Sequence, residues 1–168
     1  MIGHRSRNRC VALIMLLGLT ASPAAARDAL GVFEGWAAFS DPRPRRCYAI
    51  AEPEGRPIGA AWRPFAAIAA WPTRGVRAQV NIRLRKLKQP GTPVILTIGD
   101  SRFALVAGGA DAWAPSAAVD AAIVAAIRQA RGMRVEARAR DGGVLVDRYA
   151  LRGAATAIDA ATLACARD

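Results

Sequence analysis

The stretch VRAQVNIRLR, residues 76–85, carries the clearest structural pattern in the chain. Apolar and polar residues alternate along its whole length, and this period of two places successive side chains on opposite faces of a β-strand. The stretch therefore predicts a half-buried strand with one face in the core and one face in water. The polar positions include three arginines on the wet face, Arg77, Arg83 and Arg85.

A second alternating stretch, residues 133–140, predicts another strand of the same kind. Asp141-Gly142-Gly143 follows it and is a strong hairpin signal, so the next residues are expected to pair back. Ser116 is a candidate N-cap, because apolar residues follow it at helical spacing and Gly132 stands just beyond. The other predicted strands are 32–40, 47–52, 66–71, 94–98, 102–107 and 144–151; residues 108–115 are expected to form a loop, and the alanine-rich segment 154–166 a short helix.

Short strands joined by tight turns favour an antiparallel arrangement over a parallel sheet. We therefore predict an α+β fold, mainly antiparallel β, built as a single β-sandwich or partly open barrel with one or two short helices. Trp36 and Phe39, both in the first predicted strand, are candidates for its core.

Residues 1–26 have the order of an export signal, with three arginines first, an apolar run at 10–21 and three alanines before Arg27. An apolar run of about a dozen residues is too short to span a bilayer, which needs roughly 20. The alternatives are a buried N-terminal helix or a retained anchor. We expect cleavage before Arg27 and a single exported β-rich domain, residues 27–168, in the periplasm or secreted.

Outside the predicted signal, the chain has two cysteines, Cys47 and Cys165, and no histidine, because Cys10 and His4 lie within the signal. Two cysteines in an oxidising compartment most simply form one disulfide. In the chain-entropy model, closing so long a loop contributes about 4–5 kcal/mol. Two free thiols or an intermolecular bridge remain as alternatives.

The missing histidine excludes Ser-His-Asp and Cys-His catalysis from this region, and two cysteines are too few for an ordinary zinc site. We therefore expect no catalytic residue, no metal and no cofactor. One enzymatic alternative stays open, an exported hydrolase that uses paired carboxylates. Its acids would come from Asp100, Asp111, Asp120, Asp141, Asp147 and Asp159.

The charge of the chain is strongly positive, with 24 Lys and Arg against 13 Asp and Glu. Without the three arginines of the predicted signal the formal net charge is +8. If the two alternating strands are neighbours, their wet faces form one arginine-rich sheet surface. Such a surface would bind anionic glycans, lipid headgroups or an acidic protein, whereas nucleic acid is not expected; the alternative is a solvated face. The predicted binding residues are Arg77, Arg83, Arg85, Arg134, Arg138 and Arg140.

Aromatic and cysteine residues at both ends of the exported region form a recognisable set. At one end stand GWAAF, with Trp36, and RCYAIAEP, with Cys47; at the other end YALRG, residues 149–153, leads toward Cys165. In these features the chain resembles the invasion-associated locus B family, small exported proteins of alphaproteobacteria. Typical members carry a cysteine shortly after the tryptophan, where this chain has Phe39. The resemblance implies a distant member and a periplasmic or outer-surface protein with no established enzymatic activity.

Overall fold

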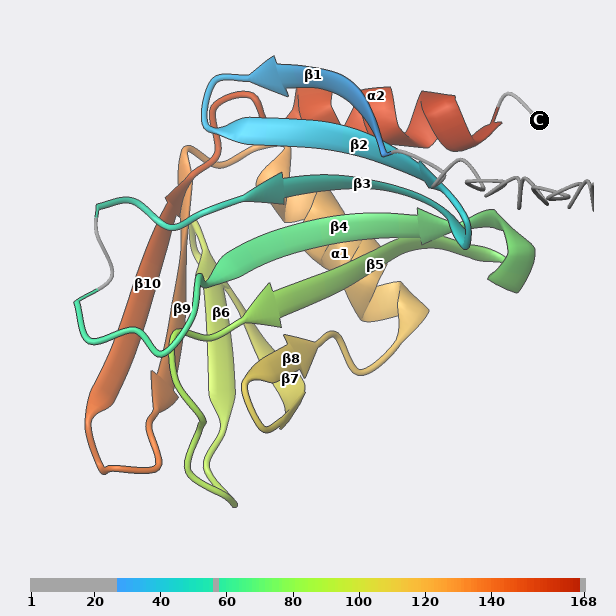
Figure 1. The fold of residues 1–168 in the computed structure, drawn as a ribbon. Helices are drawn as coiled ribbons and strands as arrows, with labels where there is room; N and C mark the ends of the chain where they lie inside the picture. The colour runs from blue at the N-terminus through green and yellow to red at the C-terminus, as the bar shows by residue number, and fades with distance from the viewer. Residues whose placement is uncertain (1–26, 56–57, 167–168) are drawn as a thin grey trace, which may run out of the picture.

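The computed structural model describes residues 27–55 and 58–166. The predicted export signal, residues 1–26, lies outside this part and stays a prediction. Within the described part, ten strands form one continuous sheet in which every neighbouring pair is antiparallel. The sheet curls into a half-barrel, which confirms the predicted mainly antiparallel α+β fold and selects the partly open barrel (Figure 1).

The strands follow the order β1-β2-β3-β4-β5-β8-β7-β6-β9-β10 across the sheet. In Figure 1 the strands β1–β5 run across the upper part of the molecule, and β6, β9 and β10 run steeply down beside them. The bounds are β1 Asp28–Phe33, β2 Trp36–Pro42, β3 Arg45–Ala51, β4 Phe65–Trp71, β5 Val76–Arg83, β6 Val94–Ile98, β7 Ser101–Gly108, β8 Asp111–Trp113, β9 Gly132–Arg138 and β10 Val144–Ala150; a 3₁₀ turn, η1 Pro72–Arg74, joins β4 to β5.

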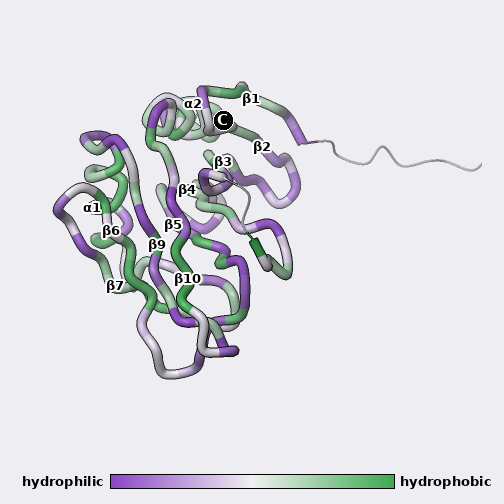
Figure 2. The backbone as a smooth tube through the Cα atoms, turned by 90° about the vertical axis from the view of Figure 1, so that its left-hand side faces the viewer, coloured by the Kyte–Doolittle hydropathy of each residue, from purple (hydrophilic) through white to green (hydrophobic). Residues whose placement is uncertain are grey.

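The core lies between the two parts of the curled sheet and the helices α1 Ala117–Ile127 and α2 Ala154–Ala166. Helix α2 packs on β1–β4, and α1 packs mainly on β5 (Figure 1). The period of two in the sequence appears directly in Figure 2, where hydrophobic and hydrophilic residues alternate along β9. No helix in the described part of the chain is long and apolar enough to cross a membrane.

Residues 32–40, predicted as one strand, are a hairpin in the structure. Strand β1 ends at Phe33 and β2 begins at Trp36, so Glu34 and Gly35 form the turn. Glu34 adopts the left-handed conformation with φ of 55°. Hairpin turns of this kind favour Asn or Asp with Gly, so a glutamate gives little sequence signal. Gly153 packs directly against the end of β1, where a larger residue does not fit. A Cβ at this position would lie 2.0 Å from the Phe33 carbonyl oxygen.

The predicted loop 108–115 contains the short strand β8, which pairs with both β5 and β7. A strand of three residues is too short to show an alternating pattern. Helix α1 begins as predicted, because Ser116 Oγ accepts a hydrogen bond from Val119 N at 3.3 Å. In the first turn of α1, Asp120 accepts a hydrogen bond from Val80 N at 2.8 Å. Burial raises the pKa of Asp120, and the hydrogen bond from Val80 opposes this effect only in part.

Candidate functional site

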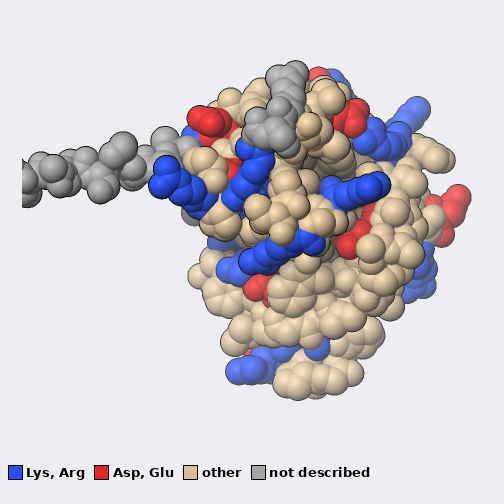
Figure 3. All heavy atoms as spheres, turned by 90° about the vertical axis from the view of Figure 1, so that its right-hand side faces the viewer, with Lys and Arg blue, Asp and Glu red and all other residues tan. Residues whose placement is uncertain are grey.

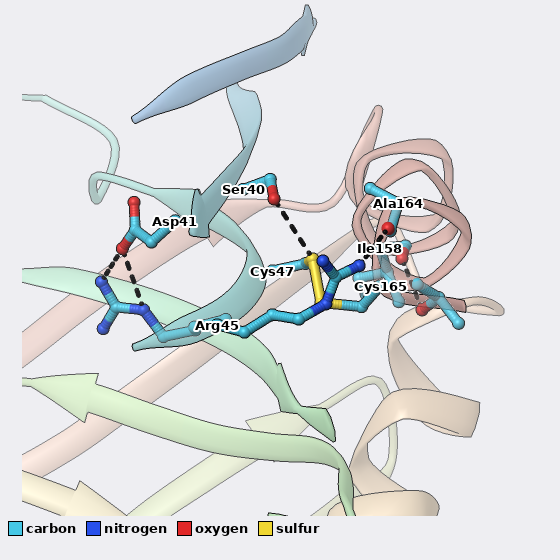
Figure 4. The surroundings of a disulfide bond; sticks show 9 residues. Ser40, Asp41, Arg45, Cys47, Ile158, Ala164 and Cys165 are labelled. Atoms are coloured by element: carbon cyan, nitrogen blue, oxygen red, sulfur yellow. Dashed lines mark hydrogen bonds and ion pairs between the residues drawn. A yellow bond between two sulfur atoms is a disulfide. The ribbon is translucent and has the colours of Figure 1, made fainter. Parts of the chain in front are cut away.

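The predicted disulfide between Cys47 and Cys165 is present and fastens α2 to β3. The two Cα atoms are 5.8 Å apart. Figure 4 shows Arg45 lying alongside the bridge, and its guanidinium donates a hydrogen bond to the Ala164 carbonyl oxygen at 3.1 Å. Ser40 Oγ lies 3.6 Å from Cys47 Sγ. The C-terminal helix is therefore held to the core side of the sheet by a covalent bond and a charged hydrogen bond.

The six arginines of the predicted binding surface do not lie on neighbouring strands. Strand β5 carries Arg77 and Arg83, strand β9 carries Arg134 and Arg138, and Arg85 and Arg140 lie just past the ends of these strands. In the sheet, β5 and β9 are separated by β8, β7 and β6. The condition that the two strands are neighbours is therefore not met, because residues 94–113 form three strands that insert between them. The segment beyond β5 does reach the end of β9, where Arg140 N donates to the Leu87 carbonyl oxygen. The role of these arginines in binding stays a prediction.

Two of the three arginines from the first alternating stretch are engaged with carboxylates. Arg83 donates through Nε and Nη2 to the two oxygens of Asp111, at 2.8 and 2.7 Å. Arg85, just past the end of β5, donates through Nε to Asp147 Oδ1 at 2.8 Å, and Asp147 is buried on β10. Arg77 is exposed. Arg85 therefore joins two parts of the sheet, while Arg83 stays on the outer surface.

The arginines of the second alternating stretch interact with groups close to them in the chain. Arg134 pairs with Glu136 at 3.0 Å, so Glu136 neutralises part of the positive charge on this strand. Arg138 Nη1 donates to the Gly142 carbonyl oxygen in the hairpin turn at 2.9 Å. Arg140 is exposed just past the end of β9. Arg134 and Arg138 therefore lie on a solvated side of β9, and Arg140 lies just beyond the strand.

A different group of basic residues gathers with aromatic rings on the outer side of β2–β5, away from the core. Strand register brings the rings together, because Phe39 is paired with Tyr48 and their ring centroids are 5.6 Å apart. Phe65 is paired in the same way with Arg83 on β5. We call this surface the aromatic–arginine face; its rings are Phe39, Tyr48, Phe65, Trp71 and Trp113, and its guanidinium groups are Arg27, Arg46, Arg74 and Arg83.

The guanidinium groups lie over the rings at distances typical of cation–π contacts. Arg46 is 4.5 Å from the Tyr48 ring centroid and 5.0 Å from that of Trp71. Arg74 also contacts this ring, at 4.8 Å from the Trp71 centroid. Arg27 is 5.5 Å from Tyr48, and at the far end Arg83 is 5.8 Å from Phe65. The rings therefore hold a row of cations in fixed places on the sheet surface.

The aromatic–arginine face keeps an excess of positive charge. Arg27 and Arg46 share one carboxylate, since their Nε atoms donate to Asp41 at 2.9 and 3.2 Å. Burial alone would raise the pKa of Asp41, but hydrogen bonds from Arg46 and Arg27, and their charges, hold it below its ordinary value. With Asp111 as the second carboxylate, four guanidinium groups face two acids. Figure 3, viewed from the side where β4 turns into β5, shows basic side chains in separate groups with uncharged atoms between them.

A groove of about 330 Å³ lies in the middle of the face. Its floor is formed by Ala67 and Ala69 of β4, and larger side chains rise around them. The small methyl groups between large rings leave the hollow. The groove is lined by Arg27, Arg46, Tyr48, Ile50, Phe65, Ala67, Ala69, Trp71, Gln79, Asn81 and Trp113.

The aspartates of the hydrolase alternative are dispersed over the fold. Four of the six form ion pairs with different basic residues, Asp120 bonds to the main chain of β5, and Asp100 is exposed before β7. Five cavities within residues 27–55 and 58–166 are each lined by at most one of the six. No group of three or more His, Cys, Asp or Glu in those residues is placed to hold a metal ion. The geometry gives the paired-carboxylate alternative no support.

The aromatic–arginine face was not predicted from the sequence, because β4, and β3 beyond its two leading arginines, are apolar on both sides. The stretches RRCYAIA and FAAIAAW show no alternation that separates an inner from an outer face. One usable signal was present: a disulfide cysteine such as Cys47 faces the core, so the next residue, Tyr48, faces outward. The remaining members come from other strands, and only the pairing register places them beside Tyr48.

Comparison with known proteins adds a likeness of fold. No family model and no curated protein matches the chain. The crystal structure of invasion associated protein B from Bartonella henselae is similar, with a TM-score of 0.59 at 14% sequence identity. The match covers 82% of this chain and 98% of that one. At this identity the finding is a shared fold.

Proposed function

We propose that this protein is a non-enzymatic, exported domain of the bacterial envelope that binds an anionic envelope component through the aromatic–arginine face. One observation carries the proposal, the placement of four guanidinium groups against aromatic rings around a groove, with two carboxylates among them. Arginine forms forked hydrogen bonds with carboxylate and phosphate, and it also stacks on aromatic rings. Cations that are already held in place lose less conformational freedom when an anion binds.

The fold likeness supports a binding role in general terms. The Bartonella protein is described as invasion associated, a description that states no reaction. A chain without histidine beyond its predicted signal also agrees with a role that needs no acid–base catalysis.

We place the aromatic–arginine face ahead of the β9 arginines as the binding surface. Arg134 and Arg138 are engaged by Glu136 and by a turn carbonyl, respectively. Arg74, in contrast, makes its described contact with the ring of Trp71 alone. Its guanidinium can therefore meet a ligand without first breaking an ion pair.

The test compares two variants that each remove two positive charges, using protein purified from the periplasmic fraction. The variant Arg46→Gln/Arg74→Gln alters the aromatic–arginine face, and Arg134→Gln/Arg138→Gln alters β9. Co-sedimentation with the isolated envelope fraction is measured over a range of salt concentrations. We expect the first variant to bind about tenfold more weakly, a difference of about 1.4 kcal/mol, and the second to bind within about twofold of wild type.

Three outcomes would contradict the proposal. Equal weakening of both variants would indicate attraction by net charge alone. Weakening of the β9 variant alone would move the site to β9. Wild-type binding by both variants would remove arginine from the interaction.

A further inference from the structure

The groove of the aromatic–arginine face offers flat rings around a floor of small side chains. Trp71 and Trp113 line it with at least partly exposed rings, and Ala67 and Ala69 leave space between them. The Tyr48 ring is buried under Arg27 and Arg46 and forms part of the wall. Trp113 is 36% exposed, so its ring is open to a ligand. Flat aromatic surfaces of this size pack well against the C–H faces of six-membered sugar rings.

Hydrogen-bonding groups complete the lining of the groove. Gln79 and Asn81 project from β5 into the same hollow. An amide both donates and accepts, which suits hydroxyl groups that also do both. Asn81 Nδ2 makes a long contact of 3.5 Å with the Ala112 carbonyl oxygen, so this amide is held on the β8 side of the groove.

The basic end of the groove is built to receive a carboxylate. Asp41 already shows the geometry, since it accepts hydrogen bonds from Arg27 and Arg46 at once. Arg74 lies 4.8 Å from the Trp71 ring centroid, just outside the groove lining, and adds a third cation near this end. An acidic group on a ligand would be drawn to this end, while its ring packs on Trp71.

A second cavity continues the groove along the sheet. It has a volume of about 520 Å³ and shares Ile50 and Phe65 with the groove as lining residues. Its walls include the apolar Val32 and Pro64 and two acids, Glu34 and Glu52, whose charges are paired with Arg152 and Arg63. Two adjacent hollows fit an extended chain better than a compact small molecule.

The groove lies over the interior of the sheet and not at a free edge, so an acidic peptide fits it less well than a glycan. Main-chain groups of β3, β4 and β5 are used in the ladders with their neighbours, so the face offers side chains alone. Extended peptides are usually recognised by main-chain hydrogen bonds at a free sheet edge. A lipid surface also fits poorly, because the exposed large apolar side chains of the described residues are scattered over separate elements.

We infer that the groove and the adjoining cavity bind an extended glycan whose sugar rings carry carboxylates. This inference rests on the proposed function and names the chemistry of the ligand. The sugar rings stack on Trp71 and Trp113, the amides of β5 meet the hydroxyls, and the basic end meets the carboxylates.

The test uses isothermal titration with polygalacturonate, a polymer of uronic acid, and with dextran as its neutral counterpart. We expect polygalacturonate to bind and dextran to bind at least about tenfold more weakly. The variants Trp71→Ala and Trp113→Ala should each weaken polygalacturonate binding about tenfold or more. Leu163→Ala, at an exposed apolar position on α2, is the matched control and should bind as wild type. Circular dichroism and thermal unfolding confirm that each variant is folded.

The outcomes separate this inference from the proposed function. Binding to phosphatidylglycerol vesicles or to poly-L-glutamate, without binding to polygalacturonate, would overturn the glycan inference and leave the proposed function standing. Failure to bind all of these probes and the envelope fraction would overturn both. Equal binding of dextran would remove the carboxylate requirement, and unchanged binding by both folded tryptophan variants would remove the groove as the site.

Discussion

Trp36 and Phe39 lie three positions apart on β2, and this odd spacing sends their side chains to opposite faces of the strand. Trp36 is fully buried, and its Nε1 donates a hydrogen bond to the Ala150 carbonyl oxygen at 2.9 Å. Phe39 lies on the outer side, against Tyr48 and Arg27. The prediction of a core position is therefore confirmed for Trp36 and wrong for Phe39.

Truncation of these two residues should separate a core ring from a surface ring. Trp36→Ala is expected to lower the free energy of unfolding by about 3–5 kcal/mol, because it leaves a cavity and an unpaired carbonyl. Phe39→Ala should cost about 1 kcal/mol, because its ring stacks on a partly exposed surface. Urea unfolding followed by circular dichroism measures both values. Equal losses would contradict the assignment of the two faces.

Helix α2 has the bounds that the alanine-rich segment predicted, residues 154–166. Small side chains let the helix approach the sheet closely, and its buried side includes Ala157, Ala161 and Cys165. Alanine buries little apolar surface, so each contact contributes little on its own. The disulfide to Cys47 supplies an anchor that these small contacts need.

Removal of the disulfide should weaken the attachment of α2. The double variant Cys47→Ala/Cys165→Ala opens a loop that spans 118 positions. We expect a loss of about 2–5 kcal/mol in the free energy of unfolding, measured by urea denaturation. Wild-type protein unfolded in reductant provides the comparison and should show a similar loss. Two reactive thiols in denatured, unreduced wild type, or a variant as stable as wild type, would contradict this role.

At the scale of the whole molecule, the order of strands decides which predicted residues meet. Strands β6, β7 and β8 insert between β5 and β9, so the two arginine rows are kept apart in the sheet. The curvature of the sheet brings Arg85, just beyond β5, to the buried Asp147 on β10. An arginine predicted to bind a ligand thus holds two parts of the half-barrel together.

Loss of this ion pair should destabilise the fold more than loss of a surface pair. Arg85→Ala leaves the carboxylate of Asp147 buried without its partner, and we expect a cost of about 3–5 kcal/mol. Arg134→Ala removes a solvated pair with Glu136 and should cost less than about 1 kcal/mol. The apolar double variant Arg85→Leu/Asp147→Leu should recover much of the loss. Thermal and urea unfolding measure all three, and a small effect of Arg85→Ala would show that the pair does not join the sheet.

Local patterns in the sequence determined most of the elements of this fold. Alternation over 76–85 and 133–140, the Ser116 cap and the DGG turn each reflect contacts between residues near in the chain. With two cysteines outside the predicted signal, one disulfide within the chain was the simplest expectation, and the structure contains it.

Only the tertiary structure decided which elements became neighbours and which faces turned outward. Strand β8 is too short for a pattern, and β4, and β3 beyond its two leading arginines, are apolar on both faces. The aromatic–arginine face is therefore assembled by pairing register across β2–β5 and β8, from residues up to 86 positions apart, Arg27 to Trp113. The physical reason is that side-chain direction depends on local backbone geometry, whereas strand order depends on how the whole chain buries its apolar surface.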